Sequence, residues 1–188
     1  MLEMGTGMAI LKLSKIEAAR RQIDSAIRML FMNEDPVSIH TIAAAADRIL
    51  RNIAETKGNI DAHVRFKDLI KPGMEKEFWF YMNRASNFLK HADKDPDSIY
   101  DDFNEESNDW ILLIACYYYR DLGHTLTPEM HSLAYWMMLI HPNIIKVDHP
   151  MKAELIRISG SIDDMTRAKK LEVGSMFIEK LRRKHKGY

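Results

Sequence analysis

Helix-start signals followed by apolar residues at helical spacing recur along the chain, and this pattern constrains the fold more than any other feature. Ser14 with Glu17 forms a capping-box signature, in which two side chains satisfy backbone N–H groups at a helix start. Asp35-Pro36 and Thr127-Pro128 each combine a capping side chain with a proline suited to a first turn. No stretch shows sustained period-two alternation. The sequence therefore predicts an all-α fold.

Eight helices follow from these starts and from the glycine, proline and asparagine residues that end them. Their approximate ranges are 15–32, 36–58, 61–70, 74–92, 104–122, 128–140, 150–158 and 163–184. Ser161, with Asp164 three residues later, is expected to start the last one. The range 104–122 is apolar on nearly every face at its centre, so we expect a fully buried central helix. We predict a single-domain bundle of seven or eight helices over residues 14–188, after a flexible segment 1–13.

Composition limits the classes of function. Lys and Arg total 27, as do Asp and Glu, so the net charge is zero and any binding to nucleic acid needs a local patch. The longest apolar run, from Trp110 to Tyr119, is about half of what a bilayer crossing needs, so no membrane span is expected. No secretory signal is recognisable, and the single Cys116, an expected inert core thiol, excludes an internal disulfide framework. We expect a cytoplasmic protein.

The stretch "NRASNFLKHADKDPDSIYDDF", residues 83–103, carries the candidate site. At 100° per residue, Arg84, Asn87 and His91 form a polar strip two turns long, and Glu77 lies one step further along it. The predicted core-facing arc beside this strip comprises Phe78, Tyr81, Met82, Ala85, Phe88, Leu89 and Ala92. Burial at the edge of a core can shift pKa values, which favours catalysis. The structural alternative is an Arg84–Glu77 ion pair, with Asn87 and His91 satisfying the helix end.

Arg84, six intervening residues and His91 match an Arg-x4–6-His pattern, and in this the chain resembles the HEPN superfamily of all-helical proteins. The resemblance implies a metal-independent ribonuclease, or an RNA- or nucleotide-binding relative, without a cofactor. His91 would act as acid or base at the ribose 2′-hydroxyl or the leaving oxygen, and Arg84 would steady the phosphate, with Asn87 beside them. Such sites form across a two-fold interface, so the resemblance also implies a homodimer.

A second resemblance joins two phrases of the sequence. "NFLKHADKDPD" and "DPVSIHTIAAAADRIL" are similar to phrases shared by a widespread group of small bacterial proteins, over most of residues 14–140. The group brings no activity, but it implies that His40 and residues 87–95 belong to one signature. We therefore include His40, Asp93 and Asp95 as candidate binding residues. The alternative for His40 is a hydrogen-bonded histidine at the edge of the core.

Two further hypotheses concern the acidic segment, residues 93–109, which holds eight carboxylates and one lysine. His91, Asp93, Asp95 and Asp97 could offer ligands to a hard cation, although the glycine and the late glutamate of a calcium loop are missing. No metal site is predicted. The segment could instead attract a basic partner, for which the tail "EKLRRKHKGY" of the same or a neighbouring subunit is a candidate. A non-catalytic protein-interaction module is thus the alternative to the ribonuclease.

Overall fold

The helix starts predicted from capping side chains are mostly confirmed. In the computed structural model, which describes residues 10–58, 73, 75–91, 93, 95–142 and 152–185, Ser14 accepts a hydrogen bond from Glu17 N at 3.1 Å. Asp35 accepts from Ser38 N at 2.8 Å, and Thr127 from Met130 N at 3.2 Å. The start at Ser161 is wrong, because its hydroxyl donates to the Ile158 carbonyl at the end of the preceding helix.

Seven helices and no strand lie in the described residues, and the all-α single domain is confirmed. The helices are α1 (Lys15–Phe31), α2 (Pro36–Thr56), α4 (Glu75–Phe88), α5 (Ser107–Asp121), α6 (Pro128–Ile140), α7 (Lys152–Gly160) and α8 (Arg167–His185). The predicted helix 61–70, residues 143–148 and most of the segment 1–13 fall outside the described part of the chain. None of the described helices is both long and apolar enough to span a membrane.

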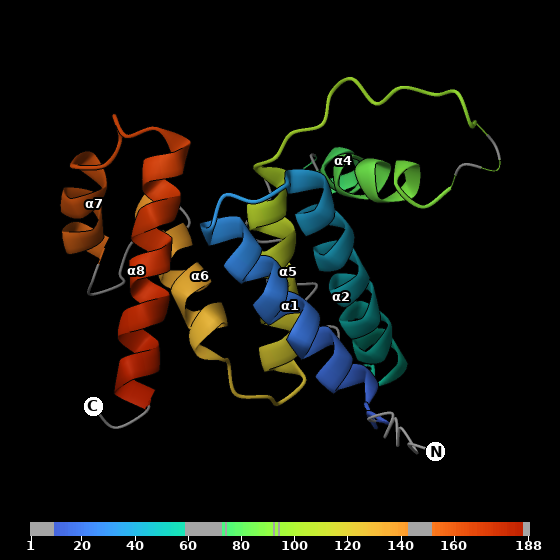
Figure 1. Cartoon of the computed structure of the whole chain (residues 1–188), viewed down its shortest axis with the longest axis horizontal. Helices are drawn as coiled ribbons and strands as arrows, with labels where there is room; N and C mark the ends of the chain where they lie inside the picture. The colour runs from blue at the N-terminus through green and yellow to red at the C-terminus, as the bar shows by residue number, and fades with distance from the viewer. Residues whose placement is uncertain are drawn as a thin grey trace, which may run out of the picture.

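The helices form a bundle with α5 inside it. Figure 1 shows α1 and α2 packed beside α5, with α6, α8 and α7 following on the other side. Buried side chains occupy most of α5, including Cys116, whose thiol pKa is raised by burial. The expected full burial is not complete, since Trp110 and Tyr117 are half-buried and Arg120 is exposed. Residues 104–106, expected to be helical, precede α5 in a turn.

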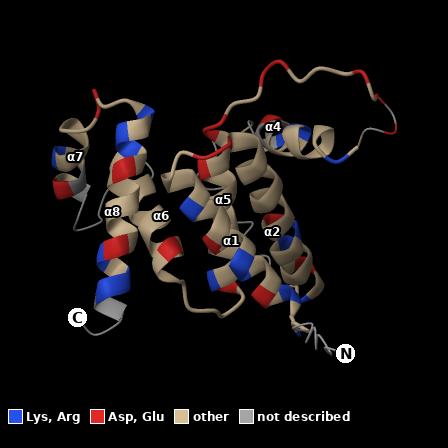
Figure 2. Cartoon of the chain, viewed as in Figure 1, with Lys and Arg blue, Asp and Glu red and all other residues tan. Residues whose placement is uncertain are grey.

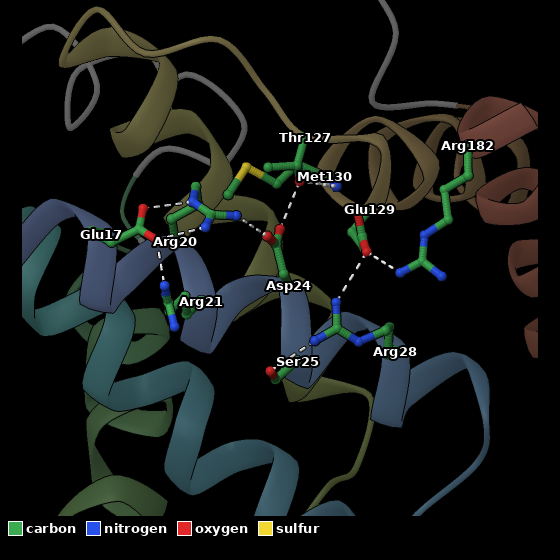
Figure 3. Close-up of polar contacts among 10 residues, drawn as sticks. All are labelled: Glu17, Arg20, Arg21, Asp24, Ser25, Arg28, Thr127, Glu129, Met130 and Arg182. Carbon is green, nitrogen blue, oxygen red and sulfur yellow. Dashed lines mark hydrogen bonds and ion pairs between the residues drawn. The ribbon is translucent and has the colours of Figure 1, made fainter. Parts of the chain in front are cut away.

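Polar contacts on two buried carboxylates, Glu129 and Asp24, join the two halves of this bundle (Figure 3). Glu129 of α6 pairs with Arg28 of α1 at 3.0 Å and with Arg182 of α8. Asp24 of α1 accepts from the Thr127 hydroxyl at 2.6 Å, and burial raises the pKa of Asp24. Because the Glu129 and Asp24 carboxyl groups are buried, losing their partners would leave polar groups uncompensated in the core, so these contacts fix how α6 and α8 sit on α1.

Gly174 marks the closest approach of α8 to α1. A Cβ atom at this position would overlap the ring of Phe31, which packs edge-on against Trp136 with ring centroids 5.4 Å apart. Since both rings are buried, neither can move aside without disturbing the core. Only glycine fits here.

We expect Gly174→Ala to lower the free energy of unfolding by about 1–3 kcal/mol, the usual cost of overpacking a core. Urea denaturation followed by circular dichroism measures this. Gly160→Ala is the matched control, because a Cβ there meets nothing within 4 Å. The control should be neutral or slightly stabilising, and an equally neutral Gly174→Ala would contradict the tight packing described here.

Candidate functional site

An open pocket of about 860 Å³ lies between the outward face of α4 and the start of the acidic segment. Figure 1 shows this segment leaving the end of α4 and arching back to α5. We call this hollow the α4 pocket; it is lined by Trp79, Phe80, Asn83, Arg84, Asn87, Phe88, His91, Asp95, Ser98, Ile99 and Tyr100. Its volume falls in the range of ligand-binding sites.

The structure brings four of the predicted site residues into the α4 pocket. Arg84, Asn87 and His91 line it from α4 and its end, and Asp95 lines it from the opposite side. The His91 side chain is 61% exposed, with Nδ1 3.9 Å from the Asp93 carboxylate. The polar strip therefore faces an accessible hollow, as the catalytic hypothesis requires.

Glu77 and Asp93 do not line the α4 pocket, although both are exposed nearby. The Arg84 guanidinium instead donates to Asp102 at 2.5 Å and lies over the Tyr100 ring, 4.9 Å from its centroid. The predicted structural alternative, an ion pair with Glu77, thus gives the wrong partner for Arg84. The observed pair is 39% and 45% exposed, so it contributes little to stability and is easily exchanged.

Aromatic side chains form walls of the α4 pocket that the sequence reasoning missed. Phe88 packs against Tyr100 with centroids 5.3 Å apart, and Trp79 and Phe80 lie further along α4. Phe80 is 60% exposed and Ile99 is 86% exposed. The signal was present in the spacing, because Phe80 is one turn before Arg84 and thus on the same face of the helix.

The core-facing side of α4 differs from the predicted arc. Met82, Ala85 and Ser86 are the buried side chains among those described on this helix, whereas Phe88 is half-buried. The buried face is therefore rotated away from the polar strip. The reason is a buried hydrogen bond that holds the polar Ser86 side chain in the core. Hydrophobic periodicity does not reveal such a bond.

That hydrogen bond comes from His40, which does not lie in the α4 pocket. His40 of α2 is fully buried, and its ring nitrogens contact Asn108 Oδ1 at 2.9 Å and Ser86 Oγ at 3.0 Å. Asn108 Nδ2 donates to the Pro36 carbonyl at 2.9 Å, which orients the amide oxygen toward His40. The Nδ1–H group therefore donates to Asn108, and Nε2 accepts from the Ser86 hydroxyl. We call His40, Ser86 and Asn108 the His40 trio.

The His40 trio also supports the wall of the α4 pocket formed by the acidic segment. The His40 ring meets Phe103 edge-on at 5.6 Å, and Phe103 meets Tyr100 at 6.3 Å. Tyr100 in turn packs on Phe88. A continuous row of rings therefore holds the acidic segment against α4, so His40 positions the site from behind it.

A buried ion pair supports α4 on its other side. Asp47 of α2 pairs with Arg51, and burial raises the pKa of Asp47. The Arg51 guanidinium lies over the Trp79 ring, 5.1 Å from its centroid. A small cavity of about 30 Å³ separates these groups from Asn83 and Asn87. Its volume suits one water molecule rather than a ligand.

The metal hypothesis finds no support in the described residues. Within them, no three His, Cys, Asp or Glu side chains converge closely enough to hold an ion. His91, Asp93, Asp95 and Asp97 therefore do not form a ligand set in this arrangement.

Comparison with known proteins adds no assignment to this geometry. We found no protein-family model, no curated protein and no solved structure that matches the chain.

We expect His40→Leu to lower the free energy of unfolding by about 1–3 kcal/mol at pH 7.5, because it leaves Asn108 and Ser86 without a buried partner. Burial lowers the pKa of His40, so the unfolded chain takes up a proton first as the pH falls through about 6.5. The contribution of the His40 ring to the free energy of unfolding of wild type is therefore lost as the pH falls toward 5. The difference in the free energy of unfolding between wild type and His40→Leu should therefore become smaller as the pH falls over that range.

Urea denaturation at several pH values measures this gap. His131→Leu, at a half-buried position on α6, serves as the control and should stay within about 0.5 kcal/mol of wild type. If the difference in the free energy of unfolding between wild type and His40→Leu does not change with pH, the buried His40 ring is not neutral in the folded protein.

Proposed function

We propose that the chain is a non-catalytic binding module that receives a positively charged segment of a protein partner in the α4 pocket. The observation that carries this proposal is the combination of aromatic walls with Asp95 in the lining and further exposed carboxylates along the bordering segment. Aromatic faces attract cations, and carboxylates at the edge add charge attraction and orientation.

The acidic segment borders the α4 pocket as a rim, and Asp95 is the carboxylate of this rim that lines the pocket itself. Seven carboxylates lie between the end of α4 and the start of α5, namely Asp93, Asp95, Asp97, Asp101, Asp102, Glu105 and Glu106. Figure 2 shows this charge along the arch. Arg84 offsets one carboxylate and Arg167 another, by contacts of 2.5 Å and 3.2 Å. The remaining field favours a cationic ligand and disfavours a phosphodiester backbone.

The pocket already holds a cation of its own in the manner expected for a ligand. Arg84 lies over Tyr100 while its guanidinium pairs with Asp102. A partner's arginine or lysine can make the same pair of contacts with Phe80 and a neighbouring carboxylate such as Asp95. Exposed Phe80 and Ile99 offer apolar contact area beside these charges.

We expect wild-type protein to bind a subset of peptides on an array of random 12-residue sequences, with enrichment of Lys and Arg among those bound. The Phe80→Ala/Ile99→Ala variant should lose at least tenfold in affinity, since exposed anchor side chains at the centre of an interface contribute more than about 1.4 kcal/mol. Fluorescence anisotropy with the selected peptides measures the change.

Met32→Ala is the matched control for this experiment. Met32 is 68% exposed at the end of α1 and is not among the residues that line the α4 pocket. The control should bind like wild type. An array without selective binding, or equal affinities for wild type and the double variant, would refute the binding module.

The second candidate function is the HEPN-like ribonuclease, which one observation favours. Arg84, Asn87 and His91 line the same open pocket. In this reaction Arg84 would exchange Asp102 for a phosphate, and His91 would transfer a proton to or from a ribose oxygen. The weak exposed pair of Arg84 permits that exchange. The acidic rim opposes the approach of RNA, which is why this function ranks second.

If the ribonuclease function holds, purified protein cleaves unstructured RNA in EDTA and leaves 2′,3′-cyclic phosphate ends. His91→Ala should then reduce the rate by about 10²–10⁴-fold while the helical content stays unchanged. His131→Ala is the control and should cleave normally. Undiminished cleavage by His91→Ala removes this histidine from the mechanism, and absence of cleavage by wild type removes the function.

A further inference from the structure

The basic end of α8 is the counterpart of the acidic rim. Lys180 and Arg183 are exposed there, three residues apart and so on one face of the helix. The Arg183 side chain is 78% exposed, and its contact with Glu179 is long, at 3.8 Å. The sequence continues with Lys184, His185 and Lys186. Arg182 points elsewhere, since it pairs with Glu129.

The two charged regions lie at opposite ends of one molecule. Figure 2 shows the end of α8 near the C-terminus, on the far side of the bundle from α4 and the acidic arch. The contacts of Arg182 with Glu129 and of Gly174 with Phe31 hold α8 in that position. The basic end of α8 therefore cannot reach the α4 pocket of its own chain.

We propose that the basic end of α8 docks in the α4 pocket of a second copy of this chain. The inference rests on the proposed binding function and names the occupant of that pocket. Lys180 and Arg183 would lie against Phe80 and Asp95 in the pocket and against the exposed carboxylates of Asp97 and Asp101 on the bordering segment. The two sets of charges are opposite in sign, and the chain as a whole is neutral, so its net charge does not oppose the approach of two copies.

Such a contact is head-to-tail, because one copy offers α8 and the other offers α4. Head-to-tail contacts close into rings or grow into open chains, unlike the two-fold interface that the HEPN resemblance implies. The average size of the assembly should therefore rise with protein concentration until a ring closes, or without limit if none does. Association should weaken with salt, since exposed charges carry it.

Analytical ultracentrifugation of the full chain tests the inference. In 50 mM NaCl the weight-average mass of wild type should rise with concentration, and in 500 mM NaCl it should return to that of a monomer. Lys180→Glu/Arg183→Glu and Asp97→Lys/Asp101→Lys should each weaken association at least tenfold. An equimolar mixture of the two variants should associate again, because each reversed end then meets a pocket of opposite charge.

Lys169→Glu is the matched control, on the same helix and 64% exposed but at its other end, and it should associate like wild type. Wild type that stays monomeric in 50 mM NaCl overturns the inference. So does a mixture of the two variants that stays monomeric. If the monomeric protein still binds basic peptides through Phe80, the binding module stands and the occupant comes from another protein.

Discussion

The candidate site depends on a buried hydrogen-bonded contact between three helices. His40 of α2 joins Ser86 of α4 to Asn108 of α5, and every polar atom of its ring has a partner. An unpaired polar group in a core destabilises the fold by about as much as several apolar contacts stabilise it. The three helices can therefore pack in only one position along one another that pairs all of these groups. Among the described side chains of α4, Met82 and Ala85 are the others that are buried, and both are apolar, so this polar contact is the one that selects the direction in which the outer face of α4 points. The α4 pocket exists because α4 is held there.

The chemistry of the α4 pocket follows from which charges are already paired. Asp102 pairs with Arg84, so the guanidinium that lines the pocket is offset, while the exposed carboxylates of Asp95, Asp97 and Asp101 add negative charge beside it. A neutral wall of rings beneath that field favours cations over anions. The same residues that predict RNA chemistry from the sequence therefore support the proposal of a cationic ligand once their neighbours are known. Charge balance over the whole chain conceals this local imbalance.

Much of the fold could be predicted from sequence, because capping and periodicity are local. Ser14, Asp35 and Thr127 act within one turn of themselves, and all three predictions hold. The prediction for Ser161 is wrong because a serine hydroxyl can donate to a carbonyl at the end of one helix as well as cap the start of the next. The predicted end of α4 lies four residues after the observed end at Phe88, because the sequence "LKHA" that follows contains no strong helix breaker.

The candidate site was predictable only in part, because its supports are not local. The strip Arg84, Asn87 and His91 follows from helical spacing, and the structure does place it along one pocket. Nothing in the spacing reveals that Ser86 turns inward or that His40 sits 46 residues away as its partner. These hydrogen bonds also constrain how the sequence can change in evolution. A related chain that replaces one member of the His40 trio must also change the other two, because each would otherwise lose its buried hydrogen-bond partner. Their joint variation across relatives would then record the orientation of α4 more faithfully than the pocket residues themselves.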